Sequence, residues 1–96
     1  MFDYNELEKQ SVLEKYFSDS KKLNLVRFPK KQKQKYLCLL WIITLFSKDR
    51  TYTEKEVNSI LKEVHQDYVM IRRYLVDYQL IDREKDGSSY WVKPNN

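Results

Sequence analysis

Apolar residues recur at helical spacing in four stretches of the chain. They predict helices over residues 5–17, 30–46, 53–64 and 67–78. The second half of the second stretch is apolar almost all round, so this helix must be covered on more than one side. The first helix can cover part of it and a second copy of the chain the rest, which favours a homodimer.

The third and fourth stretches carry start signals of their own. Thr53 followed by Glu56 has the spacing of a capping box, and Asp67 can cap the next helix. Only a short turn containing His65 and Gln66 separates the two helices. Two helices joined in this way are typical of a helix-turn-helix.

A β-hairpin is predicted after these helices, because residues 80–84 and 89–93 flank Asp86-Gly87. A two-residue loop places Asp82 opposite Trp91, whereas a three-residue loop with a left-handed Gly87 places Ile81 there. We favour the longer loop, since it sets apolar against apolar. Residues 51–52 can add a short strand to this hairpin.

This order of elements predicts a mainly α (α+β) domain, a winged helix-turn-helix with an extra N-terminal helix and a C-terminal β-hairpin wing. The single domain spans residues 1–96. Ser18 to Ser20 with Lys21 and Lys22 are expected to form a turn, and residues 23–28 an extended segment before Pro29. The parts are an N-terminal helix and turn (1–20), a basic segment and core helix (21–50), the helix-turn-helix (51–79), the wing (80–93) and a tail (94–96).

Composition argues against an enzyme and against a metal site. The single cysteine, Cys38, lies in an apolar stretch and allows neither an internal disulfide nor a thiolate zinc cluster, so we expect a buried, inert thiol. The one histidine, His65, is expected to cap a helix end. Gly87 is the only glycine, so a glycine-rich phosphate loop is missing too. We expect a non-enzyme without metal or cofactor. No long apolar run is present, and we expect a cytoplasmic protein without a membrane partner.

Positive charge is concentrated in one block. Residues 21–48 hold eight cations and no acid, although the whole chain carries only +4. Such a block indicates an anionic partner, or else a solvated helix start. On a helix of 1.5 Å per residue its lysines lie roughly 24 Å before Phe46, so we expect them to point away from the helix-turn-helix. The candidate anion- or partner-binding residues are Arg27, Lys30, Lys31, Lys33 and Lys35.

A second candidate site lies on the last helix and the wing. Arg73 points away from the inward stripe of that helix and Arg72 sits on its flank, so both can contact bases or phosphates. Arg83 and Lys85 extend this site onto the wing. Alternatively, Arg73 pairs with Asp77 and Arg72 with a nearby acid. From residue 53 to 82 there are six acids against four cations, which weakens attraction to a polyanion.

Three tyrosines also allow two interpretations, as contact residues or as core residues. Tyr52, Tyr74 and Tyr90 can stack on bases or anchor a partner, but core packing is expected more often for such residues.

Four motifs, taken together, resemble a bacterial family of short domains of unknown function. The resemblance extends from about Val12 to Trp91, and it implies no catalytic residue or cofactor. Members occur alone or attached to regulators of the helix-turn-helix type. At Gln79 the family pattern more often has glycine, so we expect this helix to end differently. The motifs are RFPKKQKQK, YTEKEVNSIL, HQDYVMIRRYLVDYQLIDR and DGSSYW.

Two functions follow as expectations. In the first, the chain is a DNA-binding transcriptional regulator of the winged-helix type that binds duplex DNA. In the second, it is a non-catalytic interaction module that binds an acidic protein or RNA through its basic segment. The fold alone does not decide between them.

Overall fold

The computed structural model describes residues 2–19 and 21–94. These residues form four α-helices and two small antiparallel hairpins, so the predicted α+β class with mostly helical structure is confirmed. Of the predicted turn and tail, Ser20, Asn95 and Asn96 lie outside the described residues. The elements are α1 (Glu6–Tyr16), β1 (Phe17–Asp19), β2 (Asn24–Leu25), α2 (Gln32–Ile42), the 3₁₀ turn η1 (Ile43–Leu45), α3 (Glu54–Lys62), α4 (Tyr68–Asp77), β3 (Ile81–Arg83) and β4 (Tyr90–Val92).

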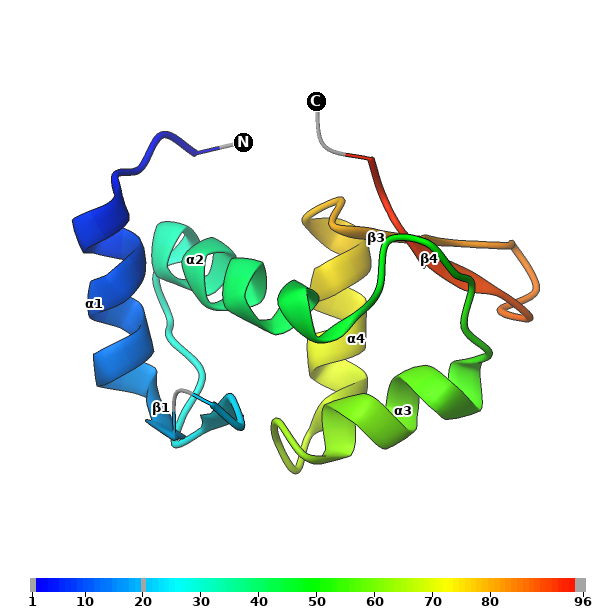
Figure 1. Cartoon of the computed structure of the whole chain (residues 1–96), viewed down its shortest axis with the longest axis horizontal. Coiled ribbons are helices and arrows are strands. Elements are labelled where there is room, and N and C mark those ends of the chain that lie inside the picture. Colours follow the sequence, from blue (N-terminus) through cyan, green and yellow to red (C-terminus); the bar gives the residue numbers. More distant parts are fainter. Residues whose placement is uncertain (1, 20, 95–96) are drawn as a thin grey trace.

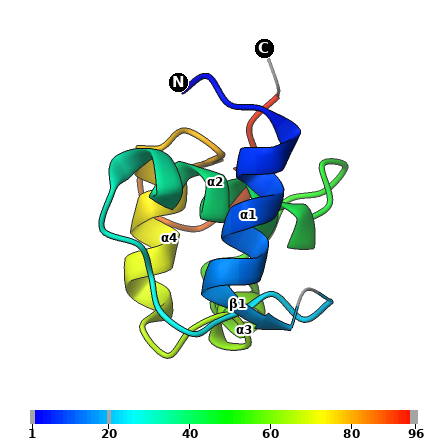
Figure 2. The same ribbon diagram turned by 90° about the vertical axis from the view of Figure 1, so that its left-hand side faces the viewer.

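Helix α4 stands between two parts of the molecule. In Figure 1, α1 and α2 lie on one side of it and the β3–β4 hairpin on the other, with α3 below. Figure 2 shows α1 in front of α2, and α4 beside them. One hydrophobic core joins all these elements, and its fully buried members include Leu39 and Ile42 of α2, Leu61 of α3, and Ile71 and Leu75 of α4.

Helices α1, α3 and α4 begin where a side chain satisfies free backbone N–H groups, whereas α2 has no side-chain cap. Thr53 accepts a hydrogen bond from the Glu56 N–H while the Glu56 carboxylate accepts one from the Thr53 N–H, so the predicted capping box is confirmed. Asp67 accepts from the Met70 N–H at 3.2 Å, as predicted. Asn5 forms a second capping box at the start of α1.

Helix α2 is covered from within the chain. It begins at Gln32, two residues later than predicted, and tightens into η1 from Ile43. The indole N–H of Trp41 donates to the Lys9 carbonyl oxygen of α1 at 2.8 Å, and Leu39 is fully buried. The predicted cover by α1 is therefore confirmed, and the homodimer stays a prediction.

The first hairpin was missed from the sequence. Phe17 pairs with Leu25, and the Val26 N–H donates to the Tyr16 carbonyl oxygen at 2.8 Å. Leu23, which was expected to be extended, is left-handed (φ 54°) and buried. Leucine rarely adopts this backbone conformation, and turns usually carry glycine, asparagine or aspartate instead. A leucine at this position therefore gives no turn signal in the sequence.

The favoured register of the second hairpin was wrong. Asp82 lies opposite Trp91 and Ile81 opposite Val92, which is the register predicted for the two-residue loop. The last backbone hydrogen bond before the turn joins Glu84 to Ser89, so the loop between these two residues has four residues (85–88). Successive residues of a strand face opposite sides, so this register alone places Tyr90 and Val92 on the same face as Ile81. Ile81 and Tyr90 are both buried.

The left-handed Gly87 expected with the longer loop is present, and the strand expected at residues 51–52 is reduced to a bridge. Gly87 is left-handed (φ 75°), and its N–H donates to the Glu84 carbonyl oxygen at 2.9 Å. Tyr52 forms an isolated bridge to Tyr90, with both backbone hydrogen bonds present. Residue 52 therefore joins β4 by a single bridge rather than as a third strand.

We expected α4 to end differently from family members that have glycine at position 79. Instead, Gln79 ends the helix in the same way as a glycine would. Gln79 is left-handed (φ 61°), its N–H donates to the Val76 carbonyl oxygen, and the Leu80 N–H donates to that of Leu75. These two bonds are the Schellman pattern. A non-glycine residue pays about 1–2 kcal/mol for this conformation.

Replacing Gln79 with glycine is therefore expected to stabilise the protein. We expect Gln79→Gly to raise the free energy of unfolding by about 0.5–1 kcal/mol, because relief of backbone strain exceeds the added freedom of the unfolded chain. Urea unfolding followed by circular dichroism measures this change. Gln79→Ala, which keeps a Cβ, serves as the control and should bring no gain. A glycine variant no more stable than the wild type would contradict the reading of this turn.

Candidate functional site

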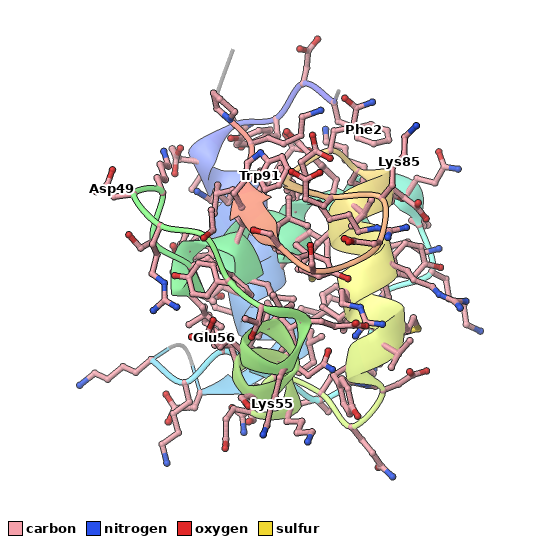
Figure 3. All side chains as sticks on the ribbon, turned by 90° about the vertical axis from the view of Figure 1, so that its right-hand side faces the viewer. Phe2, Asp49, Lys55, Glu56, Lys85 and Trp91 are labelled. Carbon is pink, nitrogen blue, oxygen red and sulfur yellow. The ribbon has the colours of Figure 1, made fainter. Side chains whose placement is uncertain are left out.

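All four residues predicted for the site on the last helix and wing line one pocket. The pocket has a volume of about 330 Å³ and lies between α4, the start of α3 and the β3–β4 loop. Figure 3 looks onto this side, with α3 below the hairpin, α4 to its right and Lys85 labelled near α4. The cations are Arg72, Arg73, Arg83 and Lys85, and the acids Glu54, Asp77 and Asp86 lie among them.

Arg72 is held by two partners within the fold. Its guanidinium forms an ion pair with Glu54 at 3.0 Å and donates a hydrogen bond to the Asn58 side-chain oxygen. Only 16% of the Arg72 side chain is exposed. Of the two readings of this residue, pairing with a nearby acid is confirmed, so Arg72 joins α4 to α3.

Arg73 differs from its neighbour. It is exposed, and within residues 2–19 and 21–94 no carboxylate lies within ion-pair distance of it, so the predicted pairing with Asp77 does not form. The same holds for Arg83 and Lys85 on the β3–β4 hairpin. Three cations from two elements therefore remain available to an anion at this pocket.

Acidic side chains limit the positive charge of the pocket. Hydrogen bonds from the Ser88 side chain and backbone N–H lower the pKa of Asp86, so this carboxylate stays ionised at neutral pH. Asp77 and Glu54 add two more acids to the lining. Asp77 was named from the sequence as an alternative partner of Arg73, whereas Glu54 was missed because no local signal connects the start of α3 with α4.

The five residues of the basic segment have different neighbours, although Lys31 and Lys33 line one hollow together with Glu8. Lys33 forms an ion pair with Glu8 of α1 at 2.6 Å, and Arg27 lies 5.2 Å from the ring of Tyr16. The Lys35 ammonium instead donates to the Tyr74 hydroxyl of α4 at 3.2 Å. Lys30 and Lys31 are exposed just before α2.

The start of α2 also lies closer to α4 than expected. Besides the Lys35 contact, the ring of Phe28 stacks on Tyr74 with centroids 5.2 Å apart. Figure 2 shows the segment that enters α2 passing beside α4. The expectation that Lys30 to Lys35 all point away from the last two helices was wrong for Lys35, because the sequence did not reveal how α2 lies relative to α4.

The three tyrosines divide between core and surface. Tyr52 and Tyr90 are buried, which confirms the core reading for both. Tyr74 is half-buried in a row of neighbouring rings that continues through Tyr78 to Tyr36. Burial raises the pKa of Tyr36, with the nearby Tyr4 adding to the effect.

His65 and Cys38, which we expected to have structural roles, have contacts that fit those roles. His65 Nδ1 accepts a hydrogen bond from the Asp67 N–H at 2.9 Å, in the turn before α4. Cys38 is fully buried, and burial raises the pKa of its thiol to about 12. Across the part of the chain that the structure describes, histidine, cysteine and carboxylate side chains form no cluster suited to a metal ion. The helices described are all too short or too polar to span a bilayer.

These observations define a small, mainly helical α+β protein with a cationic pocket between its last helix and its second hairpin. Residues 24–92 match a family described as "Uncharacterized protein conserved in bacteria (DUF2087)", and the chain belongs to this family. This confirms the resemblance seen in the sequence, although the match starts at Asn24 rather than near Val12. No curated protein and no solved structure matches the chain.

The environment of Arg72 leads to a test by stability. We expect Arg72→Ala to lower the free energy of unfolding by about 1–2 kcal/mol, since it removes a charged hydrogen bond and a packed alkyl chain. The ion pair contributes less, because Glu54 is 47% exposed and screened by solvent. Arg73→Ala is the matched control, expected to change stability by less than about 0.5 kcal/mol. Equal effects of both substitutions in urea unfolding would refute a structural role for Arg72.

Burial of Cys38 predicts a pH dependence. The folded state keeps the thiol proton up to about pH 12, whereas the unfolded thiol loses it near pH ~8.5. The thiol's contribution to stability is therefore complete below that lower value. It falls as the pH rises, by up to about 1.4 kcal/mol per unit.

Comparison with Cys38→Ala isolates this contribution, because the other groups that titrate in this range are common to both proteins. We expect the stability of the wild type to fall more steeply than that of the variant between about pH 9 and 11, in urea unfolding at several pH values. Parallel curves would show that the Cys38 thiol is not protected.

Proposed function

We propose that this protein is a non-catalytic transcriptional regulator that binds duplex DNA as a winged helix-turn-helix. Helices α3 and α4 form the helix-turn-helix, and β3–β4, with the bridge at Tyr52, is the wing. Arg73, Arg83 and Lys85 carry this proposal, because they come from the last helix and the wing and line one open pocket. Such a protein acts in the cytoplasm, where bacterial DNA lies.

The exposed side of α4 is the surface proposed to enter the major groove. Arg73 lies there with Val69, Met70 and Asp77, which line a separate hollow on this helix. An arginine can donate two hydrogen bonds to a guanine, and the methyl groups of Val69 and Met70 offer apolar contact to thymine. Arg83 and Lys85 are proposed to contact phosphates beside the groove.

Charge sets the strength of the proposed complex. Since Arg72 is engaged with Glu54, three cations at the pocket are available to the phosphates of a random duplex, where Arg73 contacts the backbone instead of a selected guanine. Each phosphate contact contributes about 0.9 to the slope of log affinity against log salt concentration. Binding to random duplex should therefore be weak, with a slope of about −3.

Fluorescence anisotropy of a labelled random duplex, at a series of salt concentrations, tests this value. We expect Arg73→Gln, Arg83→Gln and Lys85→Gln each to weaken binding and to reduce the slope by about one. Asp86→Asn should strengthen binding, because it removes a carboxylate that stays ionised at the pH of the assay. Lys22→Gln, which changes an exposed lysine between β1 and β2 that does not line the pocket, is the matched control.

A second variant separates this proposal from the basic-segment module. Lys30 and Lys31 are exposed and do not line the pocket, so their joint replacement by glutamine should leave the pocket contribution to the slope unchanged. If this variant abolishes binding while the pocket variants bind like the wild type, the DNA-binding role of α4 and the wing is refuted. An absence of binding to duplex at low salt refutes it equally.

A further inference from the structure

A second cavity, of about 440 Å³, lies away from the cationic pocket. It is bounded by the end of α2 with η1, by the chain that follows α4 and by the end of β4. Tyr4 and Lys9 close it from the N-terminal side. Its volume is within the range of about 300–1,000 Å³ that small-molecule sites have.

The floor of this cavity is apolar. Leu40 and Ile43 come from α2 and η1, Leu80 from the turn after α4, and Val92 from β4; all four are only partly buried. Phe46 adds a ring that packs edge-on against Tyr52, with centroids 5.2 Å apart. Covering this partly exposed apolar surface with an apolar ligand is favourable, because it removes the surface from water.

The charged side chains in the described lining of this cavity are all lysines, and we call them its rim. They are Lys9, Lys48 and Lys93, and the described part of the lining contains no carboxylate. The Lys9 ammonium lies 4.7 Å from the ring centroid of Trp41, and that of Lys93 donates to the Gln79 side-chain oxygen at 3.3 Å. Unlike the pocket at α4, which holds three acids, this site carries uncompensated positive charge.

We propose that this cavity binds a small amphipathic carboxylate, such as a medium-chain fatty acid. The apolar floor takes the hydrocarbon body, and the three lysines attract the carboxylate at the mouth. A neutral hydrophobic molecule of equal length uses the floor alone, and a small polar anion uses the rim alone. The combination therefore selects a ligand with one apolar end and one anionic end. This inference does not depend on DNA binding.

Isothermal titration calorimetry with decanoate tests the site, with the neutral 1-decanol as the matched ligand. We expect decanoate to bind with a dissociation constant of about 100 μM or lower, and decanol to bind at least about tenfold more weakly. Lys48→Gln/Lys93→Gln should weaken decanoate at least about tenfold and leave decanol unchanged. Lys22→Gln, remote from the cavity, should bind both ligands like the wild type.

A cavity-filling variant separates this site from binding elsewhere. Thr44 is exposed but lines the cavity, so Thr44→Trp fills it without disturbing the core and should abolish binding of both ligands. Circular dichroism checks that each variant is folded. The proposal is overturned if decanoate does not bind, if decanoate and decanol bind equally, or if folded Thr44→Trp binds decanoate like the wild type.

Discussion

Burial of one stripe of α4 is the constraint on which the rest of the structure depends. Ile71 and Leu75 of this stripe are fully buried against the core. Side chains of a helix lie at fixed angles to one another, so burying these two residues sets the direction of all the others. Arg72 then faces α3, Arg73 faces solvent, and Tyr74 faces the start of α2. The candidate site thus follows from how the core is packed.

The same constraint positions the hairpin. The left-handed Gln79 turns the chain at the end of α4, and Ile81 enters the core two residues later. With Ile81 fixed, the hairpin register is decided by the burial of Tyr90, which also pairs with Tyr52. The hairpin is therefore held by the buried Ile81 of β3 and by the bridge from Tyr52 to β4, and its loop lines the same pocket as α4.

Local signals predicted the helices well and the tertiary pairings poorly. Caps such as Thr53 with Glu56 act over three residues, so the sequence alone reveals them. The register of β3 and β4 was wrong because opposing Ile81 to Trp91 is as apolar as opposing it to Val92. Only the inward position of Tyr90 in the folded protein separates the two.

The candidate site shows the same division. The four cations were named from the sequence because a helix period and a hairpin signal place them on α4 and the wing. The partners of these cations were not predicted, since the contact of Arg72 with Glu54 depends on how α3 packs on α4. The contact of Lys35 with Tyr74 was missed as well, because it spans 39 residues. The second cavity was missed for this reason too: its lining comes from segments at both ends of the chain.

The two concave sites share one structural element. Gln79 and Leu80 line the second cavity, and they also join α4 to β3, the two elements that carry Arg73 and Arg83. A ligand in the proposed site would therefore contact the turn that joins α4 to the β3–β4 hairpin. Two sites are coupled only if a ligand binds two conformations of the protein with different affinity. The left-handed Gln79 is the residue at which such a difference would arise, because it holds a conformation that a non-glycine residue adopts only at a cost.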